Sequence, residues 1–178
     1  MTPEREQPEP DHLSFEEVIS LAIDIMFKDG NHVPTVFMET SNSIVVGRIP
    51  DMPPTHGERV ELMHFLGQTS AESGKVDQLH QVFMVSEGWM SEPSENKPSD
   101  IRPSQDPDRK EVLIISAIHV KEQKKRLEVL EILRDSNQQV IGLKEFLPGE
   151  EKKDEKIEIP LLDAFVQGFQ MAFRAKFS

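Results

Sequence analysis

The pair His56 and Glu58 has the spacing best suited to chemistry in this sequence. A histidine nitrogen is a common zinc ligand, and a nearby glutamate can move the proton of a zinc-bound water. The pair could therefore support a metal-dependent hydrolase or deaminase. Both residues stand at the expected start of a helix, where several side chains can face one site.

Two observations favour a structural role for this pair. The chain contains no cysteine, which excludes disulfides, thiol nucleophiles and thiolate-bound metals. Thr55 precedes Glu58 by three residues, and this spacing is the capping-box pattern of a helix start. We therefore predict helix capping over catalysis, with no catalytic residue, no cofactor and no metal ion.

A second group of candidates lies around the only tryptophan, Trp89. It ends an expected strand beside Met90 and directly precedes a long loop, and tryptophan and methionine are enriched at protein interfaces. We predict a binding surface that comprises Glu87, Trp89, Met90 and, in the loop, Ile101. The alternative is that Trp89 packs in the core.

Charge and hydropathy narrow the classes of partner. With 20 basic and 32 acidic residues, the net charge of -12 repels nucleic-acid phosphates and anionic membranes. The first residues carry acids and prolines instead of the basic start of a signal peptide, and no apolar run reaches the length of a membrane span. We expect a soluble, cytoplasmic protein that binds neither nucleic acid nor membrane.

The hydrophobic pattern predicts the elements that must position these residues. Helices are expected over 14–29, from Thr55 to about 71–74, and from Pro160 onward. Residues 126–134 fit either a helix or a strand, and we favour a strand because turn formers and a second apolar run follow. The remaining strands are expected over 33–40, 44–49, 81–90, 111–120 and about 140–143.

These elements predict an α+β layered sandwich of three helices and about six strands, in the order α-β-β-α-β-loop-β-β-β-α. Residues 1–12 form a flexible lead-in, and residues 13–178 form a single domain with a long loop at 91–108 rich in proline and serine. The second helix is a plausible crossover between parallel strands, so the sheet is expected to be mixed, although mainly antiparallel.

The order helix, hairpin, helix, strand over residues 14–90, with His56-x-Glu58 opening the second helix, resembles the front half of the cytidine-deaminase-like fold. The resemblance implies a zinc site with His56 as a ligand and Glu58 as the proton carrier. That family completes its site with Pro-Cys-x-x-Cys after the next strand, where this chain has Glu92-Pro93-Ser94-Glu95-Asn96. Thiolates therefore cannot complete the site here.

Two functions from different classes follow from the sequence. The first is a non-catalytic domain that binds another protein, or self-associates, through the rim near Trp89 and the 91–108 loop. The second is a divergent metal-dependent hydrolase or deaminase-like enzyme that uses His56 and Glu58. The first requires no missing motif, whereas the second requires carboxylates in place of the absent thiolates.

Substitution of Thr55 tests the capping interpretation. Thr55→Ala removes the hydroxyl that would accept a hydrogen bond from the first helical turn, and we expect it to lower the free energy of unfolding by roughly 0.5 to 2 kcal/mol. Chemical denaturation of the purified variant measures this loss. His56→Ala is the control, and an equal loss in both variants would contradict the capping role.

Overall fold

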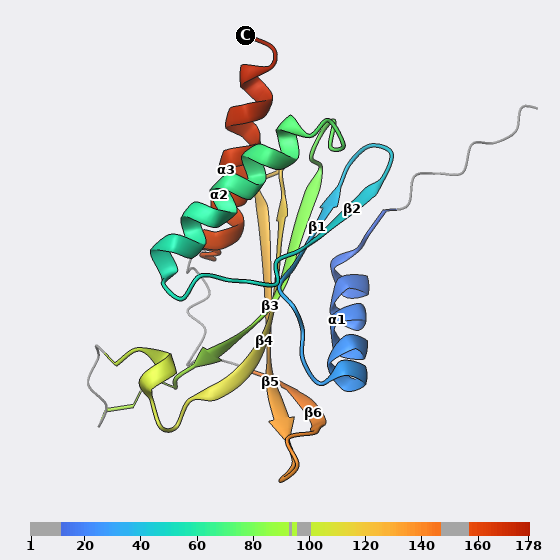
Figure 1. Cartoon of the computed structure of the whole chain (residues 1–178). Helices are drawn as coiled ribbons and strands as arrows, with labels where there is room; N and C mark the ends of the chain where they lie inside the picture. The colour runs from blue at the N-terminus through green and yellow to red at the C-terminus, as the bar shows by residue number, and fades with distance from the viewer. Residues whose placement is uncertain (1–11, 93, 96–100, 147–156) are drawn as a thin grey trace, which may run out of the picture.

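The computed structural model describes residues 12–92, 94–95, 101–146 and 157–178. Its strands form one six-stranded sheet in the order β2-β1-β3-β4-β5-β6 (Figure 1). The α+β fold class and the predicted order of elements are confirmed. The elements are α1 (Phe15–Asp29), β1 (Thr35–Glu39), β2 (Ile44–Arg48), α2 (His56–Glu72), β3 (Gln81–Met90), a short 3-10 helix η1 (Pro103–Gln105), β4 (Lys110–His119), β5 (Lys124–Arg134), β6 (Val140–Glu145) and α3 (Pro160–Ala175).

The helix starts follow the capping signals in the sequence. Ser14 caps α1 and Thr55 caps α2, and each is bonded reciprocally to the glutamate three residues later. Gly30 ends α1 in the left-handed conformation, with φ of 74°, which a glycine adopts without steric cost. None of the helices in these described ranges is long and apolar enough to cross a membrane.

The sheet corrects one expectation, because every neighbouring pair of strands is antiparallel. The predicted mixed sheet assumed that the helix after β2 would lead to a parallel neighbour. The chain does return to β3 in the same direction as β2, but β1 lies between these two strands and pairs with both. The parallel strands therefore never form a ladder with each other.

The ambiguous segment 126–134 is a strand, as predicted. It lies within β5, which pairs with β4 on one side and β6 on the other. Leu130 and Ile132, two residues apart, are buried on the α1 face, whereas Leu127 and Leu133 are exposed. The period of two in burial is that of a strand with one covered face.

Helices cover both faces of the sheet. α1 packs over one face, where Phe37 and Phe83 are buried with it. α2 and α3 pack over the other face, against Val36 and Met84 (Figure 1). An apolar stripe of α3 lies in this second core, with Leu162, Phe165 and Phe169 buried and Phe173 partly buried.

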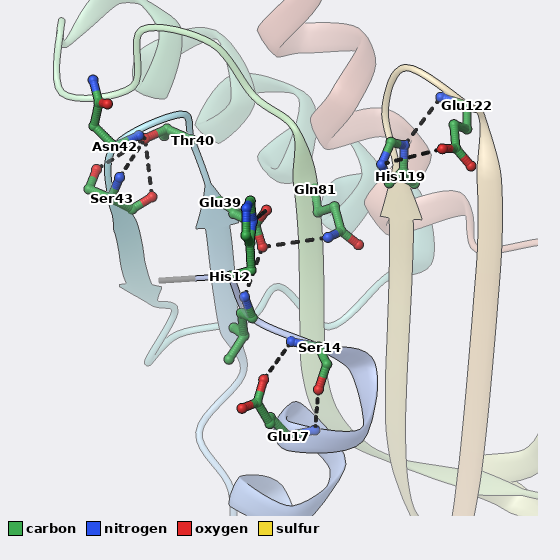
Figure 2. A network of polar contacts seen from close by, with 11 residues as sticks. His12, Ser14, Glu17, Glu39, Thr40, Asn42, Ser43, Gln81, His119 and Glu122 are labelled. Carbon is green, nitrogen blue, oxygen red and sulfur yellow. Dashed lines mark hydrogen bonds and ion pairs between the residues drawn. The ribbon is translucent and has the colours of Figure 1, made fainter. Parts of the chain in front are cut away.

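A buried carboxylate joins the start of the described chain to the sheet. The Glu39 side chain, 2% exposed, accepts hydrogen bonds from the Leu13 backbone N–H at 3.0 Å and from His12 Nδ1 at 3.1 Å (Figure 2). Gln81 Nε2, on the adjacent strand, lies 3.5 Å from the same carboxylate. These donors satisfy an otherwise costly buried charge and fix the entry of the chain into α1. Residues 1–11 of the predicted lead-in lie outside the described residues.

The two helices on the second face cross with their backbones almost in contact. At Gly67 of α2, an added Cβ would overlap the carbonyl oxygen of Phe165 and lie 2.9 Å from the Phe169 nitrogen. At Gly168 of α3, an added Cβ would overlap the carbonyl oxygen of His64. Because backbone atoms cannot turn aside as a side chain can, each position requires glycine.

Gly168→Ala tests this close approach. The added methyl group must push α3 away from α2, and we expect the free energy of unfolding to fall by about 1 to 3 kcal/mol or more. Gly57→Ala is the matched control, because Gly57 also lies in a helix, α2, and an added Cβ there has no atom within 4 Å. Equal denaturation midpoints for the two variants would contradict the crossing.

Candidate functional site

A cleft of about 880 Å³ lies between the first turn of α2, the second half of β3 and the segment around η1. It brings together residues that are far apart in the sequence. It includes both the alternative site residue His56 and the predicted binding residues Glu87 and Trp89. The lining residues are Pro54, Thr55, His56, Gly57, Arg59, Glu87, Gly88, Trp89, Arg102, Pro103, Ser104 and Glu111.

The floor of the cleft is a stretch of β3 that has a partner on one side only. β1 pairs with β3 no further than Val85, opposite Thr35. The following residues, Ser86–Met90, pair with β4 alone among the described strands. β3 extends past the end of β1 because β1 has 5 residues and β3 has 10.

The sequence before β1 explains why this pairing stops. The Val33 carbonyl, which would come next, accepts bonds from Thr35 Oγ1 at 2.7 Å and His32 Nδ1 at 2.9 Å. The Val33 carbonyl is therefore used locally, and the edge of β3 beyond Val85 has no partner strand among the described residues.

Trp89 lies at this uncovered edge with 45% of its surface exposed. The guanidinium of Arg109 stands 4.5 Å from the centre of the indole ring, and Arg109 also donates to the Ser104 carbonyl. This cation–π contact orients the ring while leaving apolar surface open to solvent. The alternative that Trp89 packs in the core is thus not the arrangement found.

A network of charged side chains supports the floor from the α1 side. Arg134 of β5 holds Glu111 with two bonds of 2.7 and 2.6 Å and donates to the Gly30 carbonyl at the end of α1. Glu87 is half-buried and accepts a bond from the His32 backbone N–H. Burial raises the pKa of Glu87 above its ordinary value, and the nearby Glu111 acts in the same direction.

Three arginines give the cleft its electrostatic character. Arg59 donates through Nε to the Pro53 carbonyl at 2.6 Å, which points its guanidinium along the first turn of α2. Arg102 is exposed on the opposite wall, and Arg109 covers Trp89. Because Arg134 is paired with Glu111, the remaining charged side chains at the cleft are these three arginines and Glu87, which is a positive surplus in an otherwise acidic chain.

The predicted residues are only partly brought together. Glu87 and Trp89 line the cleft, but Met90 is half-buried and is not among the lining residues. Ile101 is exposed directly before Arg102, and part of its loop, residues 93 and 96–100, lies outside the described residues. The three arginines were missed, because isolated charged residues carry no pattern that marks a site.

His56 and Glu58 do not converge on one point. His56 lines the cleft, whereas the Glu58 carboxylate accepts a bond from Thr55 Oγ1 at 2.6 Å and faces the Thr55 backbone N–H at 3.3 Å. The predicted capping box is confirmed. Within the described ranges, no three His, Asp or Glu side chains are grouped so that they could hold a metal ion.

Comparison with known proteins yields one family. A family model described as bacteriophage lambda protein ea47 matches residues 1–165, which is most of the chain. No curated protein and no solved structure matches the chain.

The buried His32 predicts a pH dependence of stability. Its side chain is 6% exposed, its Nε2 has no partner among the described residues, and burial lowers its pKa below 6.5, aided by Arg48 and opposed by Asp29 and the bond to Val33. As the pH falls, His32 is therefore protonated in the unfolded chain at a higher pH than in the folded protein. The free energy of unfolding should fall as the pH drops below about 6.5.

His32→Asn, whose amide can still donate to Val33, should lose this component of the pH dependence. Denaturation curves of both proteins between about pH 7.5 and about pH 5.5 measure the difference. Parallel curves for the two proteins would show that His32 does not titrate in this range.

Proposed function

We propose that this chain, which belongs to the bacteriophage lambda ea47 family, acts by binding another protein through the cleft beside Trp89. The observation that carries the proposal is the half-exposed indole ring held by Arg109 at the wall of an 880 Å³ cleft. Tryptophan and arginine are the residues most enriched at the energetic centres of protein interfaces. A large oriented ring at a concave surface can insert into a partner with little loss of conformational entropy.

The contents of the cleft favour binding over catalysis. The hydrolase or deaminase alternative requires His56 and Glu58 to act on one bound metal or water. Glu58 is instead bonded to Thr55, and its carboxylate is not among the groups that line the cleft. Of the two carboxylates that do line the cleft, Glu111 is paired with Arg134 and Glu87 accepts a bond from the His32 backbone N–H.

The charge of the chain indicates what kind of partner to seek. A net charge of -12 disfavours nucleic acid and anionic membrane surfaces as general partners, so we propose a protein partner in the cytoplasm. Self-association through the same surface is the competing outcome. It would bring two chains of equal negative charge together.

Site-specific photocrosslinking tests the proposal directly. A photoreactive phenylalanine derivative replaces Ser104 in the cleft wall or Lys121 in the exposed turn between β4 and β5. We expect a discrete adduct from position 104 and none from position 121 in cells that produce the protein. Mass spectrometry then distinguishes a partner protein from a second copy, and equal labelling from both positions would contradict a specific site.

Trp89→Ala should abolish that adduct without unfolding the protein. The ring is only half-covered, and the lost contact with Arg109 is worth about 0.5 to 1 kcal/mol at an exposed site. Phe65→Ala is the matched control, because Phe65 is 60% exposed on α2 and does not line the cleft. Crosslinking yield and denaturation midpoint are measured together, and unchanged crosslinking in Trp89→Ala would remove this residue from the interface.

A further inference from the structure

We propose that the partner enters the cleft as an extended acidic peptide segment, which adds to the uncovered edge of β3 as a further strand. This inference rests on the proposed function, since it specifies the chemistry of the protein that binds there. The open edge supplies the backbone contacts, and the arginines of the walls select the charge. Strand addition of this kind uses hydrogen bonds that any peptide can form, together with side-chain selection at alternate positions.

The register of the sheet identifies the backbone groups that are available. The Thr40 N–H bonds to Ser43, and the Ile49 N–H bonds to Pro34, so the even-numbered residues of β1 face β2. The odd-numbered residues of β1 consequently face β3, where Thr35 lies opposite Val85 and Phe37 opposite Phe83. The same alternation directs the backbone N–H and C=O groups of Glu87 and Trp89 toward the uncovered edge.

The cleft includes this part of the edge and extends across β3 to Glu111 of β4. Glu87, Gly88 and Trp89 form its floor, with the first turn of α2 on one side and the segment 102–104 on the other. An added strand would lie about 4.8 Å from β3. The cleft volume of about 880 Å³ provides the space for several residues of such a strand.

The charges of the walls favour acidic side chains on the added strand. Arg59 and Arg102 line opposite walls, and neither has an ion pair among the described residues. Arg109 adds a third guanidinium beside Trp89.

Amide hydrogen exchange of the free protein tests whether the edge is open. The amides of Ser86 and Gly88 face β4, so they should exchange at least about tenfold more slowly than those of Glu87 and Trp89. This comparison uses neighbouring residues of one strand and needs no ligand. Equal protection of all four amides would show that the edge is already covered, and would overturn the inference.

A synthetic peptide in which valine alternates with glutamate is the binding probe. Because Trp89 is the only tryptophan and the chain has no tyrosine, intrinsic fluorescence reports binding at the cleft alone. We expect this peptide to bind roughly three- to tenfold more tightly than its valine–lysine counterpart. At saturation it should also protect the Glu87 and Trp89 amides at least about tenfold. Equal affinity for the two peptides, or no protection, would overturn the inference.

Charge reversal in one wall provides an internal check. Arg102→Glu should weaken binding of the glutamate peptide and strengthen binding of the lysine peptide, because the Arg102 side chain is exposed in the cleft wall and makes no hydrogen bond or ion pair with the described residues. Lys75→Glu is the control of equal charge change, at an exposed position outside the cleft. The same shift in both variants would indicate only the overall charge of the protein.

Failure of this inference can be separated from failure of the proposed function. If position 104 captures a partner while the Glu87 and Trp89 amides stay unprotected in that complex, the partner binds the cleft without adding a strand. If position 104 captures no partner, the proposed function itself fails.

Discussion

The crossing of α2 and α3 determines how one whole layer of the molecule is placed. Gly67 and Gly168 allow the two backbones to approach until each glycine lies against a carbonyl of the other helix. The apolar side chains of both helices then pack in one layer against the sheet, where they form a core with Val36 and Met84. Since a helix is a stiff rod, this contact also fixes His56, roughly 16 Å along α2 from Gly67.

The position of the first turn of α2, which contains His56, matters because the neighbouring strands β1 and β3 differ in length. β3 continues past the end of β1, so the start of α2 stands beside a strand edge that has no neighbouring strand in the part of the chain that the structure describes. Uncovered edges are usually blocked, since they invite unwanted pairing between chains. Here the flanking segments leave a bounded cleft over the edge, which restricts access to a narrow, extended occupant. The local use of the Val33 and Thr35 polar groups keeps the preceding segment from filling it.

The hydrogen bonds of Arg134 hold together the strands that form the floor of the cleft. Its guanidinium joins β5 to Glu111 on β4 and to the last turn of α1 through Gly30. Side chains held by several charged hydrogen bonds lose little further freedom when a partner binds. This arrangement also buries polar groups such as His32 and Glu87. Burial lowers the pKa of His32 and raises the pKa of Glu87, and both shifts favour the neutral form of the side chain.

The amino-acid sequence determined the elements, because their signals are local. The two capping boxes, Gly30 and the apolar stripe of α3 act within a few residues, and the turn formers that follow residues 126–134 favoured a strand there. The sequence also marked Trp89 as the single large ring at a strand end. Tertiary structure alone decided the pairing of β1 between β2 and β3, which makes the sheet antiparallel throughout and ends the ladder at Val85. It alone brought Arg59, Arg102 and Arg109 around Trp89, because their proximity depends on strand register and on the crossing of two helices, which no local pattern encodes.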